Sequence, residues 1–421
     1  MATSILLRAH LAATDAAVDP LAALAPLLGA PGPLETTVTR GADEQGRPLL
    51  AIALHPAAEP LRVIDHGNGT ITLEAVTGTA GPGYHQHVCA RIAAAIAAAR
   101  LTVDHVEDES GYYTSRDRAA LENATLQWLR PTAMEILSLH ARGYRGLQLS
   151  LPEGTIFEHT GIVATPLGPR DHAWLVEVSR HPAHGVDALP WWHEGEGAAM
   201  LRGAAIAAMW IEVRWRKPIL EAERALLARL VDWLERAHTL DPEGAHPWRE
   251  HSELYELLGE ESLRATRTHL RASNLAPAIA LGYRRAPVRV TLSGGWSLRV
   301  PGELAEQWDE RGAWSAWDPR RTIWFTSLEA QGSRDAETTL EGLPELEGEG
   351  DLLAFERGGI RAIARFETAE QDGRLLTTMR AHAAFGAHAA VGTIVLERAS
   401  DRDWALETWA SLAHLEDKVT P

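Results

Sequence analysis

Cysteine, basic side chains and long apolar runs are all scarce in this sequence of 421 residues. The one cysteine, Cys89, excludes an intrachain disulfide and a metal site built from several cysteines, as a reducing compartment would permit. The 40 basic and 57 acidic residues leave a net charge of -17, which repels nucleic-acid phosphates and anionic lipids. We therefore expect a cytoplasmic protein that does not bind nucleic acid.

The apolar segments are too short for a membrane. Ala198–Ile211 is interrupted by Arg202 and falls short of the roughly 20 residues that a spanning helix needs. The first 29 residues lack the basic start and continuous apolar stretch of a signal peptide. We expect no membrane insertion, and Ala198–Ile211 is predicted to be a buried helix.

Phenylalanine and tyrosine are rare, with five and six residues, whereas tryptophan is abundant, with 15. Tryptophan combines a large apolar area with one N–H donor, so it suits both cores and binding surfaces. Core packing in several domains explains most of this surplus. The remainder is compatible with a face that binds a partner.

The length predicts more than one domain, because domains usually contain roughly 100–200 residues. Changes in hydrophobic periodicity favour an α+β, multi-domain fold in which helices pack on antiparallel sheets and a helical unit lies in the centre of the sequence. We predict an N-terminal α+β domain over residues 1–145, a domain of strands followed by a helical hairpin over 146–280, and a C-terminal antiparallel sheet plus helix over 285–421.

Alternating apolar residues predict a series of strands in the N-terminal domain, followed by an alanine-rich helix, a strand and a long helix that Pro131 kinks or splits. The predicted strands are Ser4–His10, Glu35–Arg40, Pro48–His55, Leu61–Asp65, Thr70–Thr77 and Leu101–Glu107, and the helices are Tyr84–Arg100 and Ser115–His140.

Extended segments are predicted next, at Leu147–Leu151, Ile156–Thr165 and Ala173–Ser179, before a helical hairpin near residues 226–258. Strand periodicity returns after Pro287 and includes Trp296–Val300. A last helix, Asp401–Leu412, follows a capping-box-like Ser400 and Asp403.

The order of segments between about residues 285 and 415 resembles a known family. A Trp-Ser-Leu-Arg-Val-Pro-Gly hairpin at 296–302, tryptophans at 314 and 317 before a strand, further strands and a terminal helix are similar to the PsbP/MOG1-like α/β sandwich. The resemblance implies partner binding rather than catalysis. The rest of the chain, including residues 81–85, resembles bacterial proteins.

The sharpest polar cluster is Tyr84-His85-Gln86-His87-Val88-Cys89. His85 and Cys89 are four residues apart, which places them on one helix face where a metal such as zinc could bind with one carboxylate. His87 points elsewhere on such a helix. The alternative is that Cys89 is a small core residue of an alanine-rich helix.

The loop before this helix, Gly78–Gly83, allows an anion at the helix N-terminus or simply a tight turn. No nucleotide-binding glycine motif is present there, so we expect no cofactor. A second polar group, in the loop that contains His181, His184 and His193, lacks the H-E-x-x-H pattern of a zinc helix and is explained by a solvated loop.

An acidic, tyrosine-containing loop follows the predicted strand Leu101–Glu107. Asp108, Glu109, Tyr112 and Tyr113 are candidate binding residues there, because carboxylates and tyrosines at a strand end can line a cleft for a cation or a basic partner. A solvated turn is the alternative.

Two functions follow from these patterns. The preferred hypothesis is a non-enzymatic bacterial interaction protein, of the adaptor or toxin-neutralising type, whose acidic surface binds a protein partner, a basic one being favoured. The binding residues would include Tyr84, His85 and His87 besides the acidic loop. The alternative is a metal-dependent hydrolase that uses the region of His85, His87 and Cys89.

Overall fold

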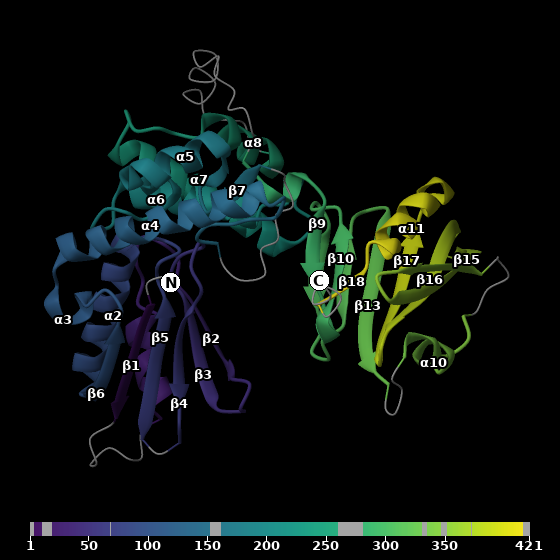
Figure 1. Cartoon of the computed structure of the whole chain (residues 1–421), viewed down its shortest axis with the longest axis horizontal. Coiled ribbons are helices and arrows are strands. Elements are labelled where there is room, and N and C mark those ends of the chain that lie inside the picture. Colours follow the sequence, from purple (N-terminus) through teal and green to yellow (C-terminus); the bar gives the residue numbers. More distant parts are fainter. Residues whose placement is uncertain are drawn as a thin grey trace. The chain divides into compact units, whose positions relative to one another are not determined.

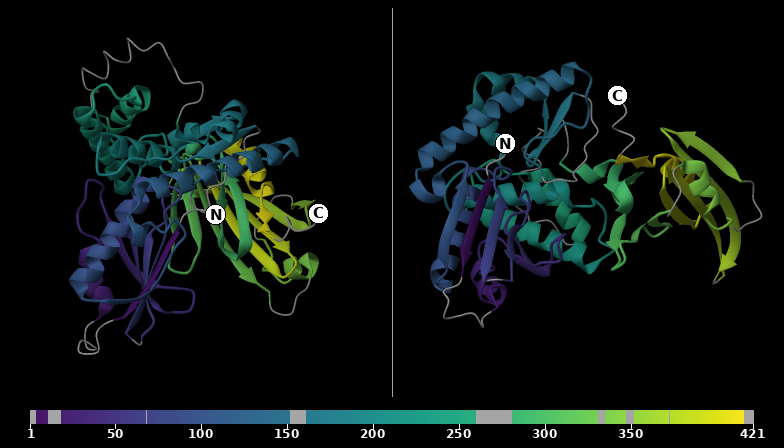
Figure 2. Two further views of the ribbon diagram at one scale, coloured as in Figure 1. Left: turned by 60° about the vertical axis from the view of Figure 1, so that its left-hand side comes forward. Right: turned by 60° about the horizontal axis from the view of Figure 1, so that its bottom comes forward.

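The computed structural model describes residues 4–10, 19–67, 69–151, 161–259, 281–330, 335–346, 352–371 and 373–415. The chain divides into two compact units, Met1–Val213 with Ala222–Gly282, and Arg214–Glu221 with Tyr283–Pro421. Figure 1 labels their elements and Figure 2 gives two further views. Both units combine helices with antiparallel sheets, which confirms the expected α+β, multi-domain fold class.

The first unit is built around an antiparallel six-stranded sheet with the order β2-β3-β4-β5-β1-β6. Alternating buried residues along β1 explain why this segment forms a strand. A two-stranded hairpin, β7-β8, forms a second sheet. The strands are β1 (Ser4–His10), β2 (Thr37–Ala42), β3 (Pro48–Ala53), β4 (Leu61–Asp65), β5 (Thr70–Val76), β6 (Thr102–Asp108), β7 (Ile162–Thr165) and β8 (Gly168–Asp171).

Helices contribute the rest of the first unit. Helices α1 and α2 pack together, and α1 also contacts β3 and β4. Helix α6 is buried on nearly all sides, as its predominantly apolar sequence predicts. The helices are α1 (Pro20–Leu28), α2 (Pro82–Ala99), α3 (Tyr112–Ser115), α4 (Arg118–Ala141), α5 (His172–Arg180), η2 (Pro182–Ala188), α6 (Ala198–Ile211), α7 (Glu221–Leu240) and α8 (Trp248–Leu258).

Helix α4 shares a hydrophobic cluster with the segments that follow it. Leu129 and Ile136 of α4 are buried together with Val163 of β7 and Leu175 of α5. This packing joins residues on both sides of the domain boundary that was predicted near residue 145. The first two predicted domains lie largely within one compact unit.

The second unit contains a three-stranded sheet, β18-β10-β9, and a seven-stranded sheet, β11-β12-β13-β17-β16-β15-β14. One hydrophobic core, centred on the buried Trp296, Trp314 and Trp409, joins both sheets to helix α11. The elements are β9 (Val288–Thr291), β10 (Trp296–Val300), β11 (Ala305–Trp308), β12 (Trp314–Trp317), β13 (Arg321–Glu329), α10 (Ala336–Glu341), β14 (Leu353–Arg357), β15 (Ile360–Gln371), β16 (Arg374–Phe385), β17 (His388–Leu396), α11 (Arg402–Ala410) and β18 (Ala413–His414).

Three local expectations need correction. Ala173–Ser179 is not extended but lies in α5, whose first turn is capped by the Asp171 carboxylate. Pro131 does not split α4, because it lies on the exposed side, where water can satisfy the carbonyl that lacks a helical partner. At the start of α11, Asp401 replaces the predicted Ser400 cap, and its side chain makes no capping hydrogen bond. The predicted extended residues 156–160 lie outside the described residues.

Across these described ranges, none of the helices combines the length and apolar character that crossing a membrane requires.

Candidate metal site

Helix α2 begins at a close contact with the chain near Trp191. Gly81 has a φ of 109°, a conformation that favours glycine, and Pro82 starts the helix. The Gly83 N–H donates to the Trp191 carbonyl at 3.0 Å, and the Trp191 N–H donates to the Ala80 carbonyl at 2.8 Å. These bonds favour a tight turn over an anion site in this loop, because the Gly83 N–H already donates to a backbone carbonyl and is not free to bind an anion.

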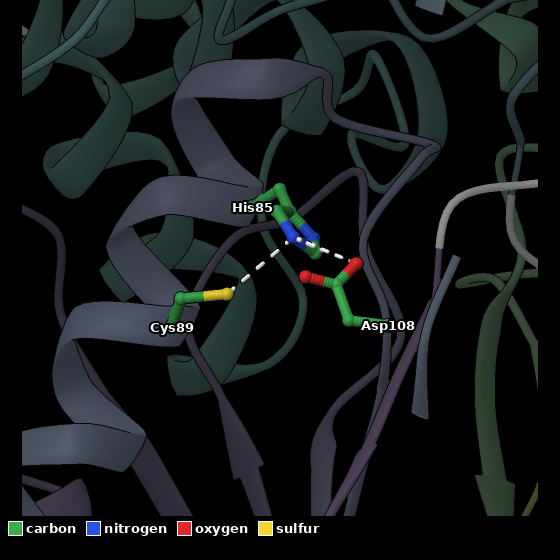
Figure 3. A group of neighbouring side chains, drawn as sticks. All are labelled: His85, Cys89 and Asp108. Carbon is green, nitrogen blue, oxygen red and sulfur yellow. Dashed lines mark hydrogen bonds and ion pairs between the residues drawn. The ribbon is translucent and has the colours of Figure 1, made fainter. Parts of the chain in front are cut away.

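His85 and Cys89 lie one turn apart on the same face of α2, as their spacing predicted. The Cys89 sulfur lies 3.4 Å from His85 Nε2, and the Cys89 and His85 side chains are 0% and 1% exposed. At the other side of the imidazole, Nδ1 lies 2.8 Å from the Thr77 hydroxyl oxygen. Figure 3 shows the His85 ring between the Cys89 sulfur and the Asp108 carboxylate.

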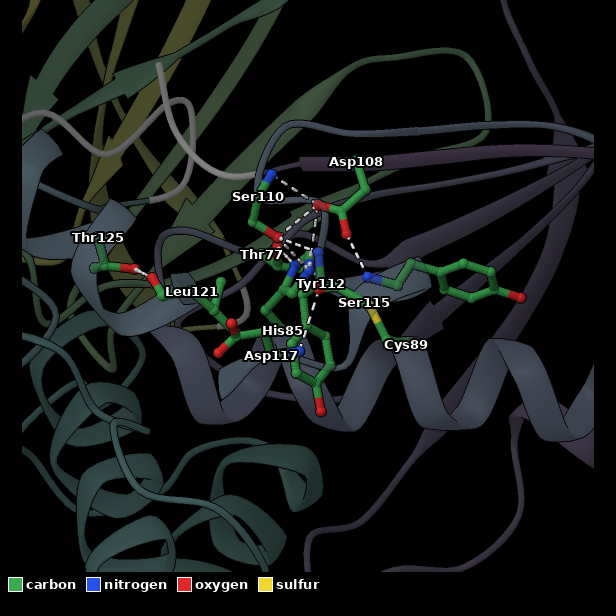
Figure 4. A network of polar contacts seen from close by, with 11 residues as sticks. Thr77, His85, Cys89, Asp108, Ser110, Tyr112, Ser115, Asp117, Leu121 and Thr125 are labelled. Atoms are coloured by element: carbon green, nitrogen blue, oxygen red, sulfur yellow. Dashed lines mark hydrogen bonds and ion pairs between the residues drawn. The ribbon is translucent and has the colours of Figure 1, made fainter. Parts of the chain in front are cut away.

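Asp108 ends strand β6 and turns inward rather than toward solvent. Its side chain is 3% exposed, and its Oδ1 atom lies 3.5 Å from His85 Nε2. The carboxylate accepts hydrogen bonds from the Ser110 hydroxyl at 2.6 Å, the Ser110 N–H at 2.9 Å and the Tyr113 N–H at 2.6 Å (Figure 4). Burial alone would raise the pKa of Asp108, but hydrogen bonds from His85, Ser110 and Tyr113 hold it well below its usual range.

One histidine nitrogen, one thiol and one carboxylate thus converge. The ligand atoms of His85, Cys89 and Asp108 all lie within 4.8 Å of one another. Among the described residues, these three side chains form the group that could hold a metal ion. The Ser110 hydroxyl oxygen lies 3.2 Å from His85 Nε2, and the Tyr112 ring meets the His85 ring edge-on at 5.8 Å. Sulfur, imidazole and carboxylate ligands together are typical of zinc sites.

The Cys89 thiol is not prepared for nucleophilic catalysis. Burial, followed by the negative charge of Asp108, raises its pKa to about 12. The thiol therefore stays protonated at neutral pH, whereas a reactive cysteine has a lowered pKa. A nucleophile–histidine–acid triad also needs the nucleophile and the acid at opposite imidazole nitrogens, and here both lie at Nε2.

Tyr84 and His87, both predicted as binding residues, lie apart from this group. Tyr84 is fully buried against His55 and Trp191, and burial raises the pKa of its hydroxyl. The His87 ring lies 4.9 Å from the Trp191 ring at a tilt of 40°, and His87 accepts a hydrogen bond from Arg91 at 3.0 Å. Burial, and then the charge of Arg91, lowers the pKa of His87 to about 4. The structure does not bring either residue to the metal ligands.

The acidic loop divides into buried and exposed parts. Asp108 belongs to the buried cluster, and Tyr112 contacts it through its ring. Tyr113 is half-buried with the Arg116 guanidinium 5.0 Å above its ring, and burial raises the pKa of its hydroxyl. Glu109 is exposed to solvent. Asp108 and Glu109 therefore lie in different environments, the first buried and the second in solvent.

Thr77 and Ser110 were missed by the sequence interpretation, although each contacts His85. Ser110 had a recognisable signal, because it follows Asp108 by two residues in a turn where side-chain to backbone hydrogen bonds are common. Thr77 had none, since its approach to His85 depends on how strand β5 meets helix α2.

The histidines predicted to lie in a solvated loop stay close to the surface. The His181 and His184 rings lie 5.9 Å apart, and His181 contacts Glu177 at 3.9 Å while staying 66% exposed. An exposed helix-end pair of this kind is explained by solvation.

Comparison with known proteins identifies no family. No protein-family model matches the chain, and no curated protein matches it. A crystal structure of a protein from Bacteroides thetaiotaomicron VPI-5482 is similar over 31% of this chain and 48% of that one, with 14% identity and a TM-score of 0.25. The chain spans about half the length of that protein, and a likeness at this TM-score carries no functional argument.

Proposed function

We propose that this chain is a metal-binding protein whose first unit holds one divalent cation of the zinc class between His85, Cys89 and Asp108. The observation that carries this proposal is the convergence of two ligand atoms on one nitrogen, with Sγ 3.4 Å and Oδ1 3.5 Å from His85 Nε2. In a tetrahedral site with bonds of about 2.0–2.3 Å, ligand atoms lie roughly 3.3–3.7 Å apart.

The surroundings of the ligands support the same proposal. Metal-binding histidines usually donate their second N–H to an oxygen, which fixes the tautomer and the ring orientation. Without metal, the Nε2–H of His85 faces the Asp108 carboxylate; a cation bound there would take the Nε2 lone pair, with the ring proton moved to Nδ1 and donated to Thr77. Ser110 and the Tyr113 N–H orient the carboxylate in the same way. Ligand orientation therefore requires little reorganisation when a cation binds.

Burial favours a stabilising metal over a hydrolytic one. The three ligand side chains are at most 3% exposed, whereas a hydrolytic metal keeps a position open for water and substrate. A cation here would fasten helix α2 to the turn after β6. The burial therefore supports metal binding, as in the hydrolase alternative, but it does not support hydrolysis.

Metal content and cobalt spectroscopy test the proposal. The full chain, purified from zinc-supplemented cells, is expected to contain about one zinc per molecule by mass spectrometry. After exchange with Co²⁺, a thiolate-to-cobalt charge-transfer band should appear in the near ultraviolet. Cys89→Ser should abolish that band, and Asp108→Asn should weaken metal affinity by about 100-fold or more.

His87→Gln is the matched control, because His87 lies on the same helix but outside the ligand group. It should retain the metal and the cobalt band. Circular dichroism of each variant, with and without metal, separates loss of the site from loss of the fold. Unchanged zinc content in both Cys89→Ser and Asp108→Asn would contradict the proposal.

A protein-interaction role is the second candidate, supported by strand β6. This strand lies at the edge of its sheet. Asp104 and Glu107 of the strand and Glu109 of the turn that follows are exposed. An edge strand can pair with an extended segment of another chain, and these charges favour a basic one. The resemblance of residues 285–415 to partner-binding PsbP/MOG1-like domains stays a prediction in the same direction.

A pull-down of the tagged chain from its own host, with mass spectrometry, tests this role. Reversing the charge at Glu107 and Glu109 should release a salt-sensitive basic partner, whereas reversal at the exposed Glu44 and Glu135 should not. Asp108 is left unchanged because it is buried. Equal retention by both double variants would remove the β6 edge from consideration.

A further inference from the structure

A hollow opens on the seven-stranded sheet of the second unit. Its volume is about 410 Å³, within the range of roughly 300–1,000 Å³ that small-molecule sites occupy. Strands β11, β12, β13 and β17 and the turn between β11 and β12 line it. The hollow is independent of the metal ligands, which belong to the first unit.

Strand pairing aligns four of the lining side chains in one row. Gln307 of β11 is opposite Ser315 of β12, Ser315 is opposite Trp324 of β13, and Trp324 is opposite Thr393 of β17. Directly opposed residues share a face, and neighbouring strands are about 4.8 Å apart, so the row is about 14 Å long. The alternating residues Ile323 and Phe325 lie in the core, so Trp324 faces away from it.

Trp324 contributes an exposed aromatic ring to this row of side chains. Its side chain is 48% exposed, whereas Trp296, Trp314 and Trp409 are at most 1% exposed. A large ring in the middle of a sheet face would gain free energy from burial, and the fold leaves it in solvent. An exposed indole beside a hollow offers a flat apolar surface to a ligand.

Uncharged hydrogen-bonding groups surround the indole. Ser315 and Thr393 flank it within the row, Thr326 follows it on β13, and Gln307 contributes an amide. Hydroxyl and amide groups both donate and accept. Asp309 adds a carboxylate whose Oδ1 already accepts the N–H groups of two residues in its turn.

We infer that this hollow binds a saccharide. A pyranose ring has one face of C–H groups, which can stack on the Trp324 indole, and a rim of hydroxyls, which pair with Gln307, Ser315 and Thr393. A purely apolar ligand would leave the Gln307 amide and the Thr393 hydroxyl without ligand partners, although the Ser315 hydroxyl already donates to the Gln307 backbone carbonyl at 3.4 Å. A phosphate-bearing ligand would be repelled by Asp309 and by a chain of charge -17. A lone organic cation would use Trp324 and Asp309 but none of the hydroxyls.

Calorimetry with neutral oligosaccharides tests the inference. The full chain is titrated with maltotriose, cellotriose, xylotriose, chitotriose and mannotriose, and with choline as the cation probe. At least one saccharide is expected to bind with a Kd of about 0.1–1 mM. Trp324→Ala should weaken that binding about tenfold or more, and Thr393→Val, which keeps the shape and removes the hydroxyl, several-fold.

Trp308→Ala provides the matched control. Trp308 is 45% exposed, similar to Trp324, but it is paired with Trp314 on the other face of the sheet and does not line the hollow. Its substitution should change the affinity less than about twofold. No binding by any of the five saccharides, choline binding in their place, or equal losses in both tryptophan variants would each overturn the inference. If Trp324→Ala does not fold, an unchanged saccharide affinity in Thr393→Val would overturn it as well.

Discussion

Replacing Gly83 with alanine should destabilise the first unit, although alanine is the better helix former. An alanine Cβ at this position would lie 2.2 Å from the His193 carbonyl oxygen and 2.5 Å from Cδ1 of Trp191. Neither neighbour can easily move, because Trp191 is 2% exposed and its N–H is bonded to the Ala80 carbonyl at 2.8 Å.

The expected cost follows from three contributions. Overpacking costs about 1–3 kcal/mol. Displacing the chain around Trp191 breaks its bonds with Gly83 and Ala80, which contribute about 1 kcal/mol each. Alanine returns about 1 kcal/mol through its helix propensity. The net destabilisation should be about 2–4 kcal/mol.

Urea unfolding, combined with hydrogen exchange of the α2 amides, measures this effect. The Gly41→Ala variant is the control, because an added Cβ there has no atom within 4 Å. Its stability should change by about 1 kcal/mol or less. If Gly83→Ala instead stabilises the protein by about 1 kcal/mol, Gly83 is not packed against the 191–193 segment, and the position of α2 must have another cause.

Further predictions concern acid stability, thiol reactivity and the second core. Burial, and then the charge of His238, lowers the pKa of His251 to about 4, so its stabilisation is complete above about pH 6.5 and is lost as pH falls toward 4. His251→Gln should remove about 3 kcal/mol of this loss from melting curves recorded across that pH range, while His87, whose pKa is also lowered to about 4, still contributes a loss of its own. Iodoacetamide should label Cys89 in urea but not in the native protein at pH 8, since the thiol is buried; equal rates would contradict its burial. Gly392→Ala should cost about 1–3 kcal/mol, measured by urea unfolding, because its Cβ would clash with the buried Trp409 ring; a neutral effect would refute that packing.

Elements with strong periodicity were predictable to the residue. Ser4–His10 and Trp296–Val300 form the expected strands, because alternating apolar side chains reach a core on one face. Ala198–Ile211 forms the expected buried helix, since its small and apolar residues can pack on every side. In these segments local pattern and tertiary packing favour the same structure.

Helix α5 was wrongly predicted as extended, and the reason is physical. Val176 and Val178 favour strands, and the segment is too short for its helical period to be distinguished from alternation. Leu175 and Val178, three residues apart, are buried against α4, and Asp171 caps the first turn. Packing against a distant helix outweighs the local propensity.

The candidate site was predictable only in part. The spacing of His85 and Cys89 placed them together, because four residues in a helix return to the same face. Asp108 was predicted as a binding residue of the acidic loop, and the structure buries its side chain beside His85 instead. Its position depends on the pairing of β6 with β1, which no local pattern encodes.

The buried carboxylate of Asp108 also indicates how apo and metal-bound forms should differ. Three hydrogen bonds from Ser110 and Tyr113 already satisfy it, so the first unit does not need a cation to avoid an unpaired buried charge. A bound cation would compete with the Ser110 hydroxyl, which lies near both His85 Nε2 and the carboxylate. Binding should therefore add stability in proportion to the logarithm of the free metal concentration, about 3 kcal/mol at 100 times the Kd, rather than switch folding on. Ser110→Ala should then destabilise the apo form more than the zinc form, which metal titrations of the melting temperature would reveal.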